Sequence, residues 1–196
     1  MKEPILYKIT RPIIKFLFDI TFRPTYKGLN NIPKEKRCIL VGNHTSNLDC
    51  LLLISSTKRT IHFLAKDSLI KGIKKPIFTN MGIIPVNRSI HDKNALNKAI
   101  NILNKDALIG IFPEGTINKT KDIIMPFKIG AVKMASETNA SLVPFTIKNK
   151  YKLFRRSVII EFYKPYKINT KNNDLTCENN KLMNIISSEL SKKESR

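Results

Sequence analysis

The feature that most constrains the fold of this chain is a short polar stretch, residues 43–49, that is flanked by two apolar stretches. Its sequence is Asn-His-Thr-Ser-Asn-Leu-Asp; the run Cys-Ile-Leu-Val-Gly precedes it and Leu-Leu-Leu-Ile begins at residue 51. This order predicts a buried strand, a polar turn and an apolar helix. Any chemistry that this region carries out is therefore expected in the turn.

His44 and Asp49 are the reactive pair of this stretch. On a continuous helix they would lie about 140° apart. If His44 lies in the turn and Asp49 in the first helical turn, the carboxylate can reach one imidazole nitrogen and leave the other free to take a proton. That is a Ser-His-Asp arrangement without the serine, which suits an enzyme whose substrate brings the hydroxyl. The alternative is structural: Ser46 to Asp49 also fit a capping-box pattern, in which Asp49 only binds the start of the helix.

Two other stretches extend the pattern. Phe112-Pro113-Glu114-Gly115-Thr116 follows a second apolar run, and residues 82–88 end a third run with a lone arginine, Arg88. Together with residues 43–49, in this order and at these separations, they resemble the motifs of the glycerophospholipid acyltransferases, closest to the 1-acylglycerol-3-phosphate acyltransferases. A fourth motif is matched loosely by residues 142–147. The resemblance runs from about Arg37 to Ile147.

The resemblance implies roles for individual residues. His44 would be the general base on the hydroxyl of the acceptor, and Asp49 would orient it and stabilise its protonated form. Arg88 would hold the phosphate of the acceptor, because a guanidinium group matches phosphate oxygens two at a time. Lys66 is a second candidate for this phosphate.

The resemblance also implies that Glu114, Gly115 and Thr116 complete the acceptor site. The family usually continues with Arg-Ser, whereas Ile117 and Asn118 follow here, so one expected cation is missing. The cations that could replace it are Lys119, Lys121 and Lys128.

Alternating strands and helices predict an α/β fold: one domain with a central, mostly parallel or mixed sheet flanked by helices. We expect residues 31–196 to form the catalytic domain and residues 1–30 to form a membrane-associating segment. The resemblance implies transfer of a fatty acyl group from acyl-CoA or acyl-ACP, as co-substrate and without a cofactor, to the sn-2 hydroxyl of 1-acyl-sn-glycerol 3-phosphate (lysophosphatidic acid). The product would be phosphatidic acid. Another acceptor, such as glycerol 3-phosphate or another lyso-lipid, remains an alternative.

The first segment predicts an amphipathic helix, with Lys8, Arg11, Lys15 and Asp19 in one sector. It is neither a signal peptide nor a plausible spanning helix. Periodicity alone fits a helix in the membrane interface and a helix packed on the protein core equally well. The resemblance favours the membrane, and with it a peripheral or monotopic position on the cytoplasmic face. The residues expected at the interface are Ile9, Ile13, Phe16, Leu17 and Ile20.

The charge of the chain predicts an anionic partner. Lys and Arg number 35 against 15 Asp and Glu, a net charge of +20. Nucleic acid, an acidic protein and an anionic membrane all satisfy that requirement. The sequence contains no zinc-finger spacing or RNP-like aromatic run, so we expect no nucleic acid. The resemblance implies that the anionic partner is a membrane surface. A basic nucleic-acid-binding protein and a non-catalytic membrane-surface protein are the alternatives of another class.

No metal site is predicted. His62 and His91 have no Cys, Asp or Glu at ligand spacing, and His62 is more simply a structural residue of a strand. Three cysteines without close pairing, at positions 38, 50 and 177, indicate free thiols in a reducing compartment. Phe127 fits either the core or a substrate channel.

Overall fold

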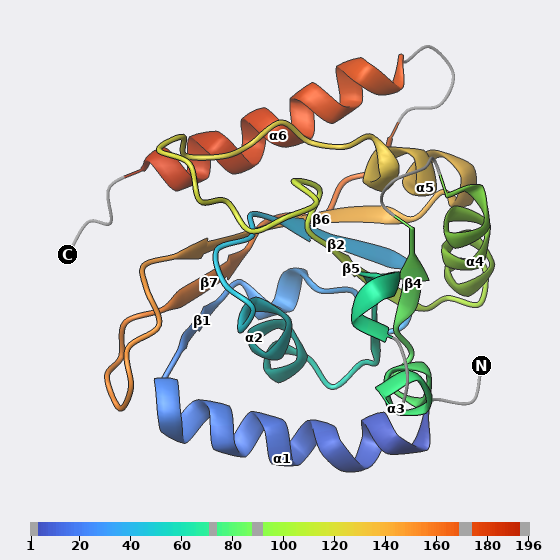
Figure 1. Cartoon of the computed structure of the whole chain (residues 1–196). Helices are drawn as coiled ribbons and strands as arrows, with labels where there is room; N and C mark the ends of the chain where they lie inside the picture. The colour runs from blue at the N-terminus through green and yellow to red at the C-terminus, as the bar shows by residue number, and fades with distance from the viewer. Residues whose placement is uncertain (1–3, 71–73, 88–91, 169–173, 193–196) are drawn as a thin grey trace.

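A mixed seven-stranded sheet forms the centre of this computed structural model (Figure 1). The structure describes residues 4–70, 74–87, 92–168 and 174–192. The strands are β1 (Thr25–Lys27), β2 (Cys38–Gly42), β3 (Ile61–Lys66), β4 (Ile84–Val86), β5 (Leu108–Ile111), β6 (Ser141–Lys148) and β7 (Ile159–Phe162). The helices are α1 (Ile5–Phe22), α2 (Asp49–Ser56), α3 (Lys74–Asn80), α4 (Lys93–Leu103), α5 (Gly130–Thr138) and α6 (Leu175–Ser191), with short 3₁₀ turns η1 (Leu29–Asn31) and η2 (Asp67–Ile70).

The strand order is β1-β7-β6-β2-β5-β3-β4. β2 pairs in parallel with both β5 and β6, and β3 pairs in parallel with β5 and β4. β7 is antiparallel to β6, and β1 is parallel to β7, so the mixed character is confined to one side of the sheet. All five residues of β2 are buried, which agrees with its continuous apolar sequence and its central position. The predicted α/β fold with a mixed sheet is confirmed.

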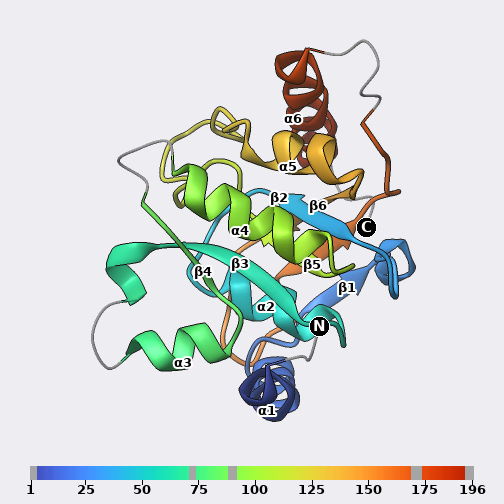
Figure 2. The same cartoon turned by 90° about the vertical axis from the view of Figure 1, so that its right-hand side faces the viewer.

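Helices cover both faces of the sheet (Figures 1 and 2). One core lies between the sheet and α1 and α2, and includes Phe18, Leu52 and Phe145. The second lies beneath α4, α5 and α6, and includes Ala99, Met134 and Leu182. Phe127 belongs to this second core and is 8% exposed, so the structure favours packing for this residue.

Helix α1 is apolar on two nearly opposite sides. Tyr7 and Phe18 are buried against the protein body, whereas the five residues predicted for the interface are all exposed. The centres of these two apolar sectors lie roughly 160° apart on the helix, at about 100° per residue. The exposed side consists of Ile5, Ile9, Ile13, Phe16, Leu17 and Ile20, and it is called the outer face of α1 below.

The charged flank of α1 contacts the rest of the protein and does not face away from it. Arg11 Nε donates to the carbonyl of Thr57 over 2.9 Å, and Asp19 accepts from Tyr26 Oη at 2.7 Å. Lys15 completes the group through an ion pair of 2.6 Å with Asp19. Polar groups therefore attach α1 along one flank and leave its outer face uncovered. Among the described residues, no helix combines the length and the apolar character that crossing a bilayer requires.

Candidate functional site

The candidate site forms where β2 and β5 end. These strands are adjacent and parallel, with Val41 opposite Ile111, so the chain leaves both at the same edge of the sheet. His44 follows the end of β2, and Phe112 to Glu114 follow β5. In α/β folds, ligands bind in the crevice outside the carboxyl ends of the strands. The motifs therefore meet because of strand order, although about 70 residues separate them.

Asn43 fixes the start of the turn. Its side-chain amide donates to the carbonyl of Ile147 over 2.9 Å, and its side-chain oxygen accepts from the Ile147 N–H at 2.8 Å. Asn43 is 5% exposed, and both of its polar side-chain groups are satisfied by the end of β6. These two hydrogen bonds continue the pairing of β2 with β6 through the Asn43 side chain. They fix the position of the backbone where it reaches His44.

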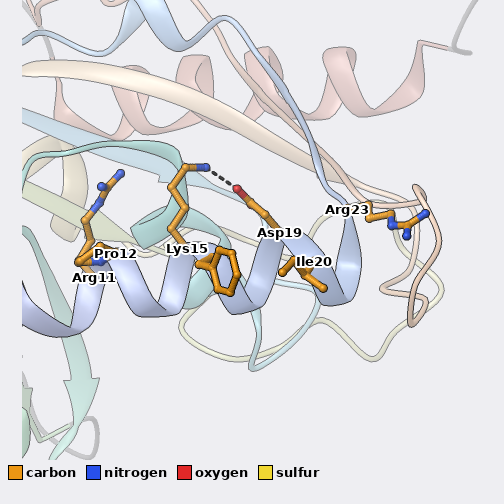
Figure 3. Close-up of a pocket in the computed structure, with 7 residues that line it drawn as sticks. Arg11, Pro12, Lys15, Asp19, Ile20 and Arg23 are labelled. Carbon is orange, nitrogen blue, oxygen red and sulfur yellow. Dashed lines mark hydrogen bonds and ion pairs between the residues drawn. The ribbon is translucent and has the colours of Figure 1, made fainter.

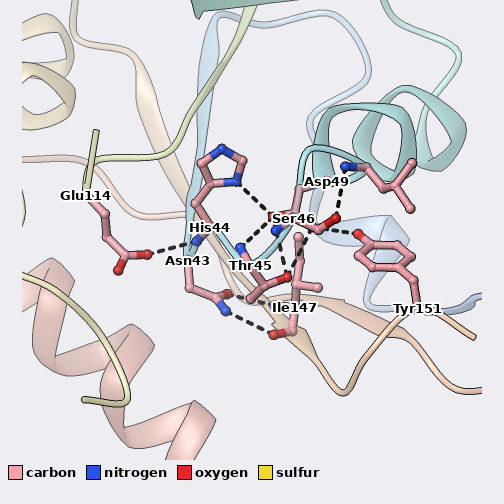
Figure 4. Close-up of polar contacts among 9 residues, drawn as sticks. Asn43, His44, Thr45, Ser46, Asp49, Glu114, Ile147 and Tyr151 are labelled. Atoms are coloured by element: carbon pink, nitrogen blue, oxygen red, sulfur yellow. Dashed lines mark hydrogen bonds and ion pairs between the residues drawn. The ribbon is translucent and has the colours of Figure 1, made fainter. Parts of the chain in front are cut away.

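Asp49 is fully buried and accepts several hydrogen bonds. Its Oδ2 lies 2.8 Å from His44 Nδ1 and accepts from the backbone N–H groups of Thr45 and Ser46 at 2.6 and 2.8 Å (Figure 4). The carboxylate therefore accepts from the backbone of the turn just before α2, including the Ser46 N–H that the capping-box pattern predicts, and it also holds the imidazole. One buried carboxylate does both because its lone pairs accept from several directions.

The contact with Asp49 gives the two imidazole nitrogens of His44 different surroundings. Nδ1 faces the carboxylate, whereas Nε2 has no hydrogen-bond partner among the described residues and points away from Asp49 (Figure 4). The ring also stacks on Phe112, with centroids 4.1 Å apart and planes 13° from parallel. With one nitrogen held, one face covered and the other nitrogen free, His44 is arranged to accept a proton from a bound hydroxyl.

Glu114 holds the backbone on both sides of the site. It is 4% exposed, and its two carboxylate oxygens accept from the N–H groups of His44 at 2.8 Å and Met125 at 2.9 Å. A further bond joins the same stretches, from the Asn118 N–H to the carbonyl of His44. The geometry thus gives Glu114 a positioning contact with His44, in addition to the acceptor-site role that the sequence predicts.

Gly115 permits a tight turn beneath a lysine. Its φ of +75° lies in the left-handed region, which residues with a side chain rarely adopt. A Cβ at this position would lie 2.9 Å from Lys128 Cε, so the Lys128 side chain passes directly over the glycine. Thr116 and Lys128 are both exposed. Lys128 therefore joins the Glu114–Thr116 turn at the same edge as His44.

The other predicted phosphate contacts belong to the neighbouring strands. Lys66 is the exposed last residue of β3 and is opposite Val86, the last residue of β4. Arg88 follows two residues later and lies outside the described residues. Because β3 and β4 are parallel to β5, Lys66 leaves the sheet at the edge where His44 lies.

Sequence reasoning missed Tyr151. Its hydroxyl donates to Asp49 Oδ1 over 2.6 Å, and its ring lies edge-on to Phe18 and Phe22 of α1. Burial, together with the negative charge of Asp49, raises the pKa of Tyr151 and keeps it a protonated donor. No spacing signal links residues 49 and 151, which lie 102 positions apart, and the resemblance ends near Ile147.

The two remaining sequence predictions concern His62 and metals. His62 is 3% exposed, and its Nδ1 lies 2.8 Å from the carbonyl of Gly82. Burial lowers the pKa of His62, which favours its neutral form. Within the described residues, no three His, Cys, Asp or Glu side chains gather into a group that could hold a metal.

Comparison with known proteins agrees with this geometry. The profile of a family described as Acyltransferase matches residues 23–148, more than half of the chain. The chain is a member of the acyltransferase family. The matched part contains the turn, the Glu114 motif and the end of β6 at Ile147.

Individual relatives of this acyltransferase family member carry more specific names. A 1-acyl-sn-glycerol-3-phosphate acyltransferase of Borreliella burgdorferi is 38% identical over 135 residues, which cover 67% of this chain and 54% of the relative. A chloroplastic 1-acyl-sn-glycerol-3-phosphate acyltransferase of Arabidopsis thaliana is 30% identical over 159 residues, 77% of this chain and 44% of the relative. The chain spans about half the length of the curated relatives that it matches.

A solved structure supports the fold. The crystal structure of the 1-acyl-sn-glycerophosphate acyltransferase of Thermotoga maritima superimposes with a TM-score of 0.73 at 21% identity. The match covers 97% of this chain and 79% of that one, so it includes the sheet and both layers of helices.

Proposed function

We propose that this chain is an enzyme that transfers a fatty acyl group from a thioester, acyl-CoA or acyl-ACP, to the sn-2 hydroxyl of 1-acyl-sn-glycerol 3-phosphate, forming phosphatidic acid. The observation that carries the proposal is the His44–Asp49 contact of 2.8 Å in a member of the acyltransferase family, with no partner for Nε2 in the described part of the chain. The names of the relatives support this choice of acceptor.

His44 carries the proton through the reaction. Its free Nε2 takes the proton of the acceptor hydroxyl as the oxygen attacks the thioester carbonyl. The carbon–sulfur bond breaks, and the departing thiolate takes the proton from the imidazolium. Asp49 stabilises the positive ring between these steps. No acyl-enzyme forms, because the substrate hydroxyl is itself the nucleophile.

The phosphate of the acceptor is held by cations at the same edge of the sheet. Lys66 ends β3, and Lys128 passes over Gly115. We assign Arg88 to the same phosphate, because it follows β4 in the sequence. Asn118 carries no charge and bonds the backbone of His44, so it does not replace the cation missing from the motif. We therefore expect Lys66, Lys128 and Arg88 to share that role.

In this proposal, helix α1 holds the enzyme on the membrane, as a peripheral or monotopic protein of the cytoplasmic face. Its outer face has the apolar side chains of an interfacial helix, with Phe16 65% and Ile20 48% exposed. A shallow depression of about 530 Å³ on α1 is lined by these two side chains together with Arg11, Pro12, Lys15, Asp19 and Arg23 (Figure 3). Residues 1–30 thus act with the domain of residues 31–196, and lipid substrates reach the site from a bilayer.

The test is acyl transfer by the full chain in mixed micelles. Radiolabelled 1-acylglycerol 3-phosphate is the acceptor, and acyl-CoA and acyl-ACP are offered separately. We expect phosphatidic acid from the wild type and a loss of roughly 10² to 10⁴ in kcat for His44→Ala, the usual contribution of a positioned base.

The matched control is His62→Asn, which removes a buried histidine outside the site while keeping a donor near the Gly82 carbonyl. This variant should keep near-normal turnover. Unchanged turnover in folded His44→Ala would contradict the mechanism. If the wild type acylates glycerol 3-phosphate or another lyso-lipid instead, the acceptor assignment is wrong and the chemistry stands. Liposome binding without transfer to any acceptor would favour a non-catalytic membrane protein, and a salt-dependent shift of DNA or RNA would favour a nucleic-acid-binding one.

A further inference from the structure

The loop between β6 and β7, residues 149–158, exposes apolar side chains at its tip. Leu153 is 63% and Phe154 is 62% exposed. Every cation of this loop is exposed as well: Lys150, Lys152, Arg155 and Arg156. An apolar pair enclosed by four positive charges differs from an ordinary surface loop, in which exposed large apolar side chains are scattered singly.

The backbone holds this tip in a defined position. Phe154 has a φ of +56°, in the left-handed region that bulky residues rarely adopt. Its N–H bonds the carbonyl of Thr21 in the last turn of α1, and the Lys152 N–H bonds Ser157 Oγ at 3.2 Å. The tip is therefore attached to the C-terminal end of α1, the helix that carries the exposed outer face.

A cationic depression lies beside the tip. It measures about 700 Å³ and is lined by Lys150, Lys152 and Arg156, together with Thr25, Asn149, Ser157 and Ile159. Ammonium and guanidinium groups with neighbouring hydroxyls are suitable donors to phosphate oxygens. Among the residues that the structure describes, no acidic side chain lines this depression to offset the charge.

We propose that the β6–β7 loop is a second membrane-contact element, which inserts Leu153 and Phe154 into a bilayer and binds the phosphates of anionic phospholipids with Lys150, Lys152 and Arg156. Charge complementarity with an anionic surface and attachment of the tip to α1, whose outer face is apolar and exposed, select this occupant. The inference rests on the membrane residence in the proposed function and does not depend on the reaction.

Binding of the full chain to sedimented vesicles tests the proposal. The vesicles contain phosphatidylcholine alone or phosphatidylcholine mixed with phosphatidylglycerol. The tip variant Leu153→Ser/Phe154→Asn keeps a residue that tolerates the left-handed backbone, and it should bind both vesicle types about tenfold or more weakly. Lys150→Ser/Lys152→Ser/Arg156→Ser should lose about a hundredfold on the anionic vesicles and little on the neutral ones.

The matched charge control is Lys93→Ser/Lys98→Ser/Lys105→Ser, which removes three exposed cations at α4, on the other face of the sheet. It should bind anionic vesicles nearly as well as the wild type. An equal loss of binding in this control would mean that net charge alone attracts the protein to the vesicles. Wild-type binding by both loop variants would leave α1 as the sole membrane contact. Either result overturns the proposal. Acyl transfer in detergent micelles, where vesicle docking is not required, separates this failure from a failure of the proposed function.

Discussion

The turn at residues 43–49 and the outer face of α1 both depart from the usual distribution of polar and apolar groups, in opposite directions. In the turn, polar side chains are buried: Asp49 has no exposed surface, and Asn43 is 5% exposed. On α1, apolar side chains are exposed, up to 76% for Ile5 and 65% for Phe16. The turn buries polar groups, which are well solvated in water, and the outer face of α1 exposes apolar groups, which are not.

The difference lies in where each region finds its partners. The buried polar side-chain atoms of Asn43, Asp49 and Glu114 all have hydrogen-bond partners within the chain. The outer face of α1 has no apolar cover among the described residues, although the opposite side of the same helix packs on the core. The polar groups of the turn are thus satisfied within the chain itself, whereas the outer face of α1 requires an apolar surface from another molecule or a membrane.

The largest effect should come from the carboxylate at the centre of the turn. Asp49→Asn removes the negative charge facing the imidazole, and the amide that replaces one oxygen can hold the ring in the wrong tautomer. We expect kcat to fall by roughly 10² to 10⁴. Steady-state acyl transfer, with circular dichroism on the same samples, measures the change.

Asp174→Asn is the control for this substitution. Asp174 also begins a helix and accepts from a backbone N–H, that of Thr176, but it has no histidine partner. Asparagine caps a helix about as well as aspartate, so activity should not change. If folded Asp49→Asn kept near-normal kcat, the carboxylate would be a helix cap alone.

A smaller effect is expected on the outer face of α1. Ile13→Ser/Phe16→Ser removes two exposed apolar side chains and should weaken vesicle binding about ten- to a hundredfold, at little cost in thermal stability. Phe18→Ala lies on the same helix but on its buried side, and it should cost about 3–5 kcal/mol of stability. Vesicle sedimentation and thermal unfolding of both proteins test the contrast. If the outer-face variant unfolded as readily as Phe18→Ala, that face would pack against protein.

The sequence was enough to predict much of the turn. Unbroken apolar runs before residue 43 and after residue 50 predicted the strand and the helix, and the five-residue spacing of His44 and Asp49 allowed the contact that the structure contains. Local chain geometry sets these features, so a local pattern reveals them. The meeting of the turn with the Glu114 motif followed from the resemblance, and strand order explains it physically.

The partners of those residues could not be predicted in the same way. The stacking of Phe112 on His44, the bonds from Glu114 to the backbone and the contact of Tyr151 with Asp49 depend on how distant segments are placed in three dimensions. The two-sided nature of α1 was missed for a related reason. A single wheel identifies an apolar sector, but only packing shows that Phe18 faces inward while Phe16 faces out.

Tyr151 connects the two regions, and it should give the smallest effect. Its hydroxyl bonds Asp49, while its ring contacts Phe18 and Phe22 of α1. Tyr151→Phe keeps the ring contacts and removes one donor from the carboxylate, so kcat should fall about two- to tenfold. The carboxylate then interacts more strongly with the imidazolium, and the acidic limb of the kcat/KM profile should move to higher pH.

The pH profile distinguishes positioning from packing at this residue. Tyr163→Phe is the control, because that hydroxyl bonds Thr146 and Glu161 rather than Asp49. Its profile should match the wild type. Tyr151→Ala, which also loses the ring contacts, should add a loss of thermal stability to the shift. A Tyr151→Phe variant with an unmoved profile and lower stability would make this tyrosine a packing residue, and the turn and α1 would then be independent of each other.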